Sequence, residues 1–474
     1  MSLEPGDQQT GSRLSIADRK ELGRSLRKSA PRSSHAEWVP APDRADPVAM
    51  LAAQDADRLD FLVPIRHLRM GESAFTFYRG TAAIMAGDLA GRPVSGLHTQ
   101  ICGDAHLSNF GAFASPERAL LFDVNDFDET LVGPWEWDVK RLAASLVLAA
   151  RSIGLDAAAA AQVSAAAVDR YREAIREFSK MGTLELWYDR VTFADIRARR
   201  LREGREIARF EKVVKKARRR TSLRAFSKLA EFVDGKPRLR SDPPLLVPSR
   251  ELPDELTGGD LEPRLRAIFD QYKETLNSEM QVLLSRFEMV DVALKVVGVG
   301  SVGTRCFVAL LIGRDEKDPL LLQVKEAGPS ALEAELGSGA YANAGQRVVE
   351  GQRLMQAFGD NFLGWAHGAV GGRDFYLRQL KDMKGSADIE AMDGARLGYY
   401  AGTCGWTLAR AHARAGDPVA IAAYLGKRGP FTAAVCRFAE IYADQAESDY
   451  IAFAEAVASG ALGSRPAAES PIQG

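Results

Sequence analysis

Residues 289–327 carry the pattern that most restricts the fold of this chain. Three runs rich in Val, Leu and Phe are separated by the glycine-rich stretch GVGSVG and by GRDEKDP. Apolar runs of this length, bounded by glycine and polar turn residues, predict strands, and short connections join antiparallel neighbours. We therefore expect three antiparallel strands in this region.

Helical patterns surround this strand region on both sides. The Ala-rich stretch after Pro134 is long enough for two packed helices with a break at Gly154, and residues 399–416 and 431–458 again show helical spacing. At 474 residues the chain exceeds the usual size of one domain. The sequence therefore predicts an α+β fold with two lobes.

The boundaries of these lobes follow from the same patterns. Residues 1–45 are rich in Ser, Arg, Pro and Asp with little apolar periodicity, which is typical of a disordered arm. We expect a large helical lobe over 46–285, a small β-rich lobe over 286–385, and a helical return to the large lobe over 386–474.

Composition excludes several classes of protein. Apolar residues make up 46%, charged residues 26%, and the formal net charge is -1, which is ordinary for a globular protein and predicts no global attraction to nucleic acid or anionic membrane. The four cysteines show no CxxC spacing and the histidines no HExxH pattern, so neither a disulfide framework nor a structural zinc site is expected. Without a signal peptide or a long apolar run, we expect a cytoplasmic protein with no membrane span.

One segment is strongly basic. Residues 197–228 contain fourteen Lys or Arg and three Glu. This pattern is typical of a solvated helix face, and the alternative is a surface that attracts an anionic partner. Nucleic-acid binding is not expected, because aromatic residues for base stacking are sparse in the segment.

The glycines Gly298, Gly300 and Gly303 form a GxGxxG motif between two predicted strands. A dinucleotide-binding fold needs such glycines to open a helix, but here CFVALLI follows, which predicts a strand. A strand, a glycine turn and a second strand form the flap that covers nucleotide phosphates in kinases. The context therefore favours a nucleotide site of the kinase kind.

The third apolar run, LLLQVKEA, contains Lys325. A lysine among apolar strand residues is costly unless its ammonium group meets an anion, although at a sheet edge it could face water. In a kinase-like site Lys325 contacts the phosphates and a glutamate of the next helix holds it. Glu350 is the first candidate for that glutamate, with Glu333 or Glu335 as the fallback.

The later strand FYLRQLKD would then meet the adenine edge. In that arrangement the backbone of Gln379, Leu380 and Lys381 forms the hinge that holds ATP. Kinases place such a hinge after the strand that follows the lysine strand and the helix. This expectation completes a nucleotide-binding half of the site.

The stretch CGDAHLSNF supplies candidates for catalysis. Phosphoryl transfer needs a carboxylate that orients or deprotonates the acceptor, and Asp104 could serve. His106, two residues later, is expected to orient groups by hydrogen bonding rather than to bind metal, because Mg²⁺ does not favour imidazole. Asp104 and His106 are therefore the predicted catalytic residues.

The stretch NDFDE and the end of CGDAHLSNF supply candidates for metal binding. Mg²⁺ prefers carboxylate and amide oxygens, and Asn109 and Asp126 offer both. Asp123 and Asp128 could replace or supplement Asp126. We therefore expect Mg²⁺ at Asn109, Asp126 and Asp128.

These residues carry a resemblance. CGDAHLSNFG, NDFDETLVGPWEWDVKRLAAS, FYRGTAA and LRQLKDMKG resemble the bacterial family catalogued as domain of unknown function 2252, over about residues 50–455. That family is grouped with the protein-kinase-like fold and has no established substrate. More distantly, residues 103–109 are similar to the HGDxHxxN catalytic loop of aminoglycoside and choline phosphotransferases, with Cys102 in place of the first His. The resemblance implies that Asp104 is catalytic, that Asn109 and Asp126 bind metal, and that Asp138 is a structural acid.

The order of the motifs departs from that of kinases. Here the segment that resembles a catalytic loop precedes the glycine motif and Lys325 by nearly 200 residues, whereas in kinases it follows them. Because termini often lie close together and permutation is tolerated there, we expect a circularly permuted kinase-like fold.

These motifs predict an ATP- and Mg²⁺-dependent phosphotransferase that acts on a small-molecule acceptor. Transfer of AMP by the same fold is one alternative, because the motifs describe a nucleotide site more than a reaction. A non-catalytic nucleotide-binding scaffold is another. Arg79 and Arg141 could each contact substrate or phosphate, or serve as structural ion-pair partners.

Overall fold

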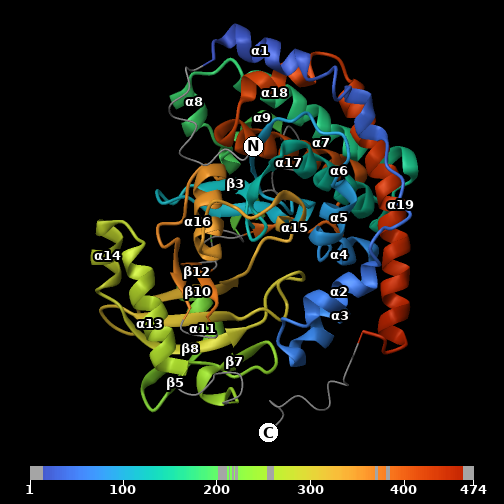
Figure 1. The fold of residues 1–474 in the computed structure, drawn as a ribbon. Coiled ribbons are helices and arrows are strands. Elements are labelled where there is room, and N and C mark those ends of the chain that lie inside the picture. The colour runs from blue at the N-terminus through green and yellow to red at the C-terminus, as the bar shows by residue number, and fades with distance from the viewer. Residues whose placement is uncertain are drawn as a thin grey trace.

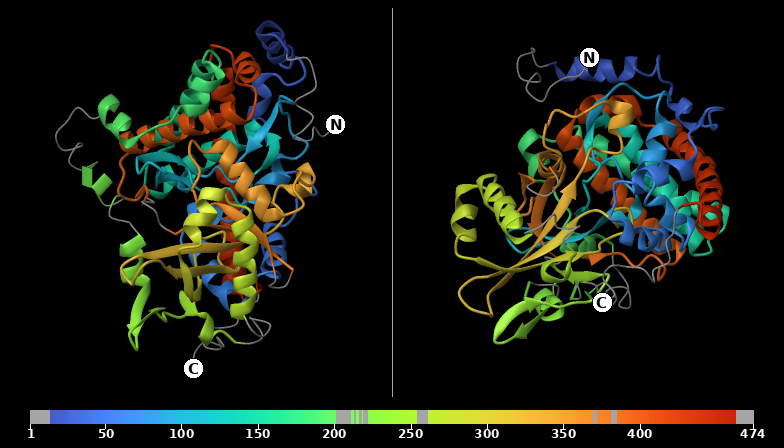
Figure 2. Two further views of the ribbon diagram at one scale, coloured as in Figure 1. Left: turned by 90° about the vertical axis from the view of Figure 1, so that its left-hand side faces the viewer. Right: turned by 60° about the horizontal axis from the view of Figure 1, so that its bottom comes forward.

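The computed structural model describes residues 14–200, 222–253, 261–368, 372–380 and 385–462, together with a few positions between 211 and 218. The fold is mixed α and β, with a larger helical part and a sheet, and Figure 1 shows these two parts above and below one another. The two further views in Figure 2 keep α1 and the sheet at opposite ends of the molecule.

The helical part is built from segments on both sides of the sheet region. The predicted helix pair is confirmed as α6 (Trp135–Ser152) and α7 (Ala157–Phe178), and the break contains Gly154 at φ +81°. Helices α17 (Gly394–Ala415), α18 (Pro418–Leu425) and α19 (Pro430–Ala458) pack against this pair. The close approach of α17 to α7 requires Gly405, because a Cβ there would lie 2.1 Å from the Ala167 carbonyl oxygen.

The expected disordered arm is wrong for residues 14–45, while residues 1–13 lie outside the described part of the chain. Helix α1 (Ile16–Ser25) begins with a capping box at Ser15 and lies on α18, where Arg19 pairs with Asp417 at 2.6 Å. Arg27 and Arg32 donate to carbonyl oxygens at the end of α18. Cations stabilise these otherwise unpaired carbonyls, which explains why an arginine-rich segment is ordered here.

Four short helices follow and lie between the helical part and the sheet. They are α2 (Pro47–Asp55), α3 (Val63–Met70), α4 (Ala74–Tyr78) and α5 (Ala82–Leu89). Figure 1 shows them, in blue, beside the strands on one side of the molecule. Their loops reach the glycine-rich turn, as described below.

The predicted three antiparallel strands are confirmed and belong to a six-stranded sheet in the order β11-β12-β10-β9-β8-β7, with antiparallel neighbours. Helix α16 (Ala344–Met355) lies between β10 and β11 in the chain and packs against β11 and β12. The strands are β7 (Leu246–Pro248), β8 (Glu288–Lys295), β9 (Cys306–Ile312), β10 (Pro319–Ala327), β11 (Gly364–His367) and β12 (Asp374–Gln379).

Helices cover both faces of this sheet. Helix α13 (Leu261–Glu274) buries Leu265, Ile268 and Tyr272 against one face. On the other face α11 (Ser222–Leu229) covers the apolar end, where Leu321 and other apolar side chains form a small cluster. The lobe boundary expected at 285 is therefore misplaced, because α11, β7, α13 and α14 (Ser278–Leu284) pack with the sheet.

Smaller sheets carry the two motif loops. Strand β1 (His98–Ile101) pairs with β4 (Leu131–Pro134), and β2 (Phe110–Ala114) lies between β3 (Leu120–Val124) and β13 (Gly385–Ser386). The remaining elements are α8 (Thr183–Tyr188), α9 (Phe193–Arg200), α15 (Glu333–Leu336), β5 (Ala230–Val233) and β6 (Lys236–Leu239).

Two expectations concern the surface of the molecule. Among the described residues, none of the helices has both the length and the apolar character needed to cross a lipid bilayer. About half of the basic segment 197–228 lies outside the described residues, and the described half is the end of α9, a few positions between 211 and 218, and α11. The two readings of that segment stay predictions.

Candidate functional site

A cavity of about 460 Å³ lies where the sheet meets the helical part. Loops after β1 and β3 line it from the helical side, and the glycine-rich turn and β10 line it from the sheet. The two motif sets, nearly 200 residues apart in the sequence, therefore meet at one cavity. The predicted residues that line it are Asp104, His106, Asn109, Asp126, Asp128, Gly298, Gly300 and Lys325.

The loop after β1 is fixed by its backbone. Gly103 has φ +79°, and a Cβ there would lie 2.2 Å from the Glu129 carbonyl oxygen, so another residue would be strained. The buried Asp138 carboxylate, in the first turn of α6, accepts from the backbone N–H groups of Cys102 at 2.8 Å and Gly103 at 3.0 Å. His412 of α17 also binds Asp138, at 3.1 Å. Asp138 thus has the structural role that the resemblance implied.

Asp104 lies on this fixed loop beside a buried arginine. Its Oδ1 accepts from Arg141 Nε at 2.8 Å, and the Arg141 guanidinium lies 3.9 Å from the centre of the Tyr78 ring. Burial raises the pKa of Asp104, and the charge of Arg141 opposes that shift. Of the two arginines considered from the sequence, Arg141 is therefore an ion-pair partner that positions Asp104.

His106 is buried next to this pair. Its Nε2 lies 3.6 Å from Asp104 Oδ2, beyond hydrogen-bonding distance, and its Nδ1 has no hydrogen-bond partner among the described residues. Burial, with Arg79 and Arg141 as nearby cations, lowers the pKa of His106 well below its usual value. His106 is therefore a neutral imidazole with an unpaired ring nitrogen.

Asn109 and Asp126 line the cavity with oxygen atoms suited to a hard cation. The Asn109 amide nitrogen donates to the Asp104 carbonyl oxygen at 2.8 Å, which leaves its side-chain oxygen as an acceptor. The Asp126 side chain is one third exposed, at 33%. Among the described residues, no group of three or more His, Cys, Asp or Glu is suited to hold a metal alone. Mg²⁺ usually takes one or two carboxylates with waters and phosphates, and this pair of residues fits that smaller requirement.

Lys325 extends from β10 toward the loop after β3. Its ammonium group is bonded to Asp128 and lies 4.0 Å from Asp126 Oδ1. Tyr376 Oη donates to Asp128 Oδ1 at 2.8 Å, and Ser301 Oγ lies 3.3 Å from Oδ2. Burial alone would lower the pKa of Lys325, but the two aspartates raise it well above its usual value. The lysine is therefore charged and held by carboxylates of the helical part.

The expected glutamate partner of Lys325 is wrong. Glu350 pairs with Arg353 at 2.9 Å on the same helix. Glu333 accepts from the Ser330 N–H at 2.9 Å, and neither Glu333 nor Glu335 is a recorded partner of Lys325 within the described residues. Asp128 takes the place of that glutamate, because the loop after β3 brings its carboxylate to the Lys325 ammonium group, whereas Glu350 of α16 is paired with Arg353.

Two of the candidate metal-binding aspartates have other partners. Asp123 is 1% exposed, and both of its oxygens lie 2.7 Å from Arg410 Nη2, so it is a buried structural acid outside the cavity. Asp128 lines the cavity, but Lys325, Tyr376 and Ser301 occupy both of its oxygens. Within NDFDE, Asp126 is the carboxylate that offers oxygens to a cation.

The expected hinge does not reach the cavity, and Lys381 lies outside the described residues. The Gln379 N–H donates to Asp360 Oδ2 at 2.7 Å, and the Leu380 N–H donates to the Leu321 carbonyl oxygen at 2.9 Å. Both backbone groups are thus occupied, and Leu380 packs in the apolar cluster under α11. A base could accept hydrogen bonds from these two N–H groups only if those bonds changed.

The glycine-rich turn joins β8 and β9 as predicted, and α2 to α4 hold it from outside. Arg69 Nη1 donates to the Gly298 carbonyl oxygen at 2.6 Å, and Arg58 Nη1 donates to the Val302 carbonyl oxygen at 2.5 Å. Gly303, at φ +92°, packs against the Arg58 side chain and does not line the cavity. Glycine is required at this position by the positive φ and by the contact with Arg58.

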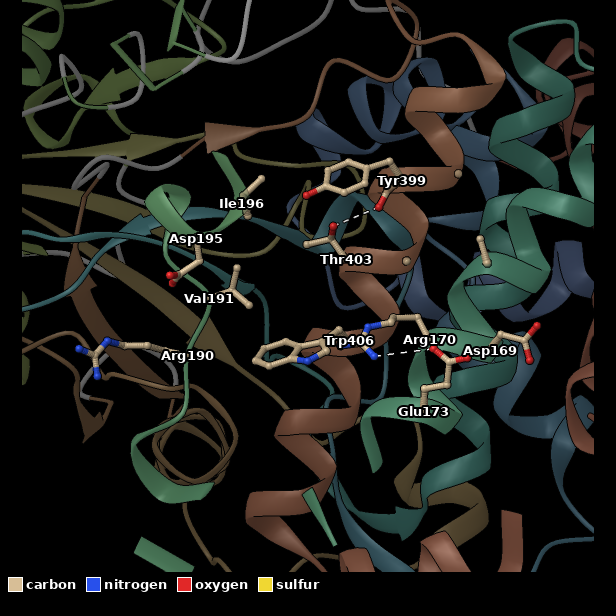
Figure 3. A pocket seen from close by; sticks show the side chains of 13 residues that line it. Asp169, Arg170, Glu173, Arg190, Val191, Asp195, Ile196, Tyr399, Thr403 and Trp406 are labelled. Carbon is tan, nitrogen blue, oxygen red and sulfur yellow. Dashed lines mark hydrogen bonds and ion pairs between the residues drawn. The ribbon is translucent and has the colours of Figure 1, made fainter. Parts of the chain in front are cut away.

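Two smaller cavities lie elsewhere. Figure 3 shows one of about 290 Å³ between α7, α9 and α17, with Trp406 and Tyr399 among the side chains that line it. Its polar groups pair within the protein: Arg170 with Glu173 at 3.8 Å and Thr403 Oγ1 with a backbone carbonyl at 3.0 Å. The other, of about 260 Å³, includes Gln379 in its lining. Neither contains the residues that the motifs predicted for catalysis.

Sequence reasoning missed several residues at the main cavity. Tyr376 and Ser301, which bind Asp128, gave no motif signal, although Tyr376 lies directly opposite Lys325 in the pairing of β12 with β10. Gln54 and Asp57 reach the cavity from α2 and the turn after it. Their positions depend on how the N-terminal helices pack, which local sequence patterns do not indicate.

Comparison with known protein families confirms the resemblance to the bacterial family of unknown function 2252. The family described as an uncharacterized protein conserved in bacteria (DUF2252) matches residues 58–456. Comparison with curated proteins and with solved structures gives no match. Since the match covers most of the 474 residues, this chain belongs to the DUF2252 family of bacterial proteins.

Proposed function

We propose that this protein is an ATP- and Mg²⁺-dependent phosphotransferase of kinase-like fold that acts on a small-molecule acceptor. One observation carries the proposal: Asp104, Asn109, Asp126, Lys325 and the glycine-rich turn line a single cavity although they come from distant parts of the chain. A carboxylate, oxygen ligands for a hard cation and a lysine are the parts that phosphoryl transfer needs.

The order of elements around the lysine supports the kinase-like fold. Strand β8, the glycine-rich turn, β9, the lysine strand β10, helix α16 and strands β11 and β12 follow one another as expected for a nucleotide-binding lobe. Helices on both sides of this segment in the sequence pack together, as a circular permutation requires. The lysine partner differs, since Asp128 replaces the expected glutamate.

Each residue has a defined task in this proposal. Asp104 accepts the proton of the acceptor hydroxyl as the hydroxyl oxygen bonds to the terminal phosphorus of ATP and the bond from that phosphorus to ADP breaks, which releases ADP. Arg141 keeps the Asp104 carboxylate oriented. Lys325 neutralises phosphate charge. Asn109 and Asp126 would hold Mg²⁺, which when bound neutralises charge on the phosphate oxygens.

The test is nucleotide binding and turnover. We expect wild-type protein to bind a nonhydrolysable ATP analogue by calorimetry only in the presence of Mg²⁺, and Asp126→Ala to lose that Mg²⁺ dependence. Asp104→Asn should keep analogue affinity and lower turnover at least about 100-fold, the usual contribution of a general base. Asp270→Ala, a change at an exposed acid of α13, serves as the matched control.

Absence of nucleotide binding to wild-type protein under all of these conditions would contradict the proposal. Transfer of AMP uses the same residues, and the mass of the modified acceptor separates it from transfer of phosphate. The N–H groups of Gln379 and Leu380 are already bonded within the protein, so an adenine base can bind through them only if those bonds break. Binding of ATP by wild-type protein without any turnover would support the alternative of a non-catalytic nucleotide-binding scaffold.

A further inference from the structure

Arg79 lines the main cavity, and no partner for it is found in the described part of the chain. It follows α4 directly, and no hydrogen bond or ion pair of its guanidinium is recorded among the described residues. Its Nε atom is buried and has no hydrogen-bond partner within the described ranges. Burial lowers the pKa of Arg79, and the charges of Asp104, Glu72 and Asp126 offset that shift only in part. An arginine remains charged in proteins, so this cation lacks a directly bonded anion.

Among the described residues, the other lysine and arginine side chains that line the cavity each have a protein partner. Lys325 binds Asp128, and Arg58 donates to the Val302 carbonyl oxygen. Arg141, just behind the cavity, binds Asp104. A planar guanidinium that is largely removed from water is stabilised best by a carboxylate or phosphate, which it binds through two parallel hydrogen bonds.

Two further features point to an anion at the same place. His106 lines the same cavity and is only 3% exposed, and its Nδ1 has no partner among the described residues. Ala82 and Ala83, the first residues of α5, also line the cavity, and Thr81 makes no side-chain cap. The N–H groups of a first helical turn lack partners within the helix and favour an anion.

We propose that Arg79, His106 and the first turn of α5 form a subsite for a phosphate or carboxylate group beside Asp104. The group belongs either to the terminal phosphate of a nucleotide or to an anionic acceptor. The subsite rests on the cavity and its unpaired donors, so it stands whether or not the cavity binds a nucleotide.

The probe is inorganic pyrophosphate, titrated calorimetrically without Mg²⁺ and without nucleotide. We expect wild-type protein to bind it and Arg79→Gln to weaken the binding at least about tenfold, because a hydrogen bond to a charged group is lost. Arg79→Lys, which keeps the charge but not the planar fork, should give an intermediate affinity. Arg92→Gln, at an arginine bonded to the Val39 carbonyl oxygen outside the cavity, should stay within about twofold of wild type.

The proposal fails if wild-type protein binds no pyrophosphate, or if folded Arg79→Gln binds it as tightly as wild type. Thermal melting establishes folding, and should Arg79→Gln not fold, Arg79→Met replaces it with the same expectations because Met keeps a stem of similar length. Repeating the titration with a saturating Mg²⁺–ATP analogue identifies the source of the anion. Competition assigns the subsite to the nucleotide phosphate, and simultaneous binding assigns it to the acceptor.

Discussion

Three aspartates between residues 123 and 128 have three different environments. Asp123 is buried against Arg410, Asp126 is open to the cavity, and Asp128 binds Lys325. Their roles depend on which long side chain from another part of the chain reaches each carboxylate. For these three residues, the role of each carboxylate is determined by the side chain that contacts it and not by the residue type, which is aspartate in all three.

The Asp123–Arg410 pair gives a stability prediction. Asp123→Ala should lower the free energy of unfolding by about 3–5 kcal/mol, because it leaves a buried arginine without its anion. Urea unfolding at neutral pH measures this change. The double variant Asp123→Ala/Arg410→Met should be less unstable than the single one, and a double variant that is more unstable would contradict the explanation.

The N-terminal segment shows how an element of polar composition becomes part of the fold. Besides the arginines that bind α18, it buries Trp38 and His35 against α19 and its neighbours. His35 Nε2 lies 2.6 Å from Tyr424 Oη. Burial, together with the nearby Lys140 charge, lowers the pKa of His35 to about 3.

This low pKa predicts acid sensitivity. The folded protein keeps His35 neutral, whereas the unfolded chain takes up a proton below pH ~6.5, so stability is present above that pH and is lost as pH falls. Between pH 7 and pH 5, His35 is expected to lower the free energy of unfolding by about 2 kcal/mol. Urea unfolding at the two pH values, compared between wild type and His35→Gln, measures it. An equal pH dependence in the variant would show that other groups are responsible.

At the scale of the whole molecule, the sheet and the helical part meet at the cavity through direct side-chain contacts. The Lys325–Asp128 pair, with Tyr376 on the same carboxylate, is one of them. Because Lys325 belongs to the sheet and Asp128 to the helical part, the interaction energy of these two side chains reports on how the two parts are joined.

A double-mutant cycle measures this interaction. Lys325→Met and Asp128→Asn should each lower the free energy of unfolding. The loss in the double variant should be smaller than the sum of the two single losses by about 1–3 kcal/mol. Thermal or urea unfolding of the four proteins gives the coupling energy. The pair Lys273→Met and Asp270→Asn, on the exposed side of α13, should show coupling below about 1 kcal/mol. Equal coupling in both cycles would mean that the cavity pair does not join the two parts.

Local patterns predicted much of the fold. The strands around the glycine motif and the α6–α7 pair have strong periodicity, and short turns define their neighbours. The order of residues 14–45 and the packing of α11 and α13 on the sheet were not predictable, because they depend on contacts with distant helices and strands. For the site, motif spacing identified Asp104, Asn109, Asp126 and Lys325, but Asp128 as the lysine partner depends on a loop almost 200 residues earlier.

The way the glycine-rich turn is held has a consequence for the kinetics of any ligand beneath it. Arg58 and Arg69 donate to its carbonyl oxygens, and its Gly303 carbonyl oxygen accepts from the Leu59 N–H at 2.8 Å. A turn without such hydrogen bonds could open readily, whereas this turn opens only when the hydrogen bonds from Arg58, Arg69 and the Leu59 N–H break. We therefore expect slow dissociation and a long residence time, set by the opening rate of the turn rather than by the affinity of the contacts alone.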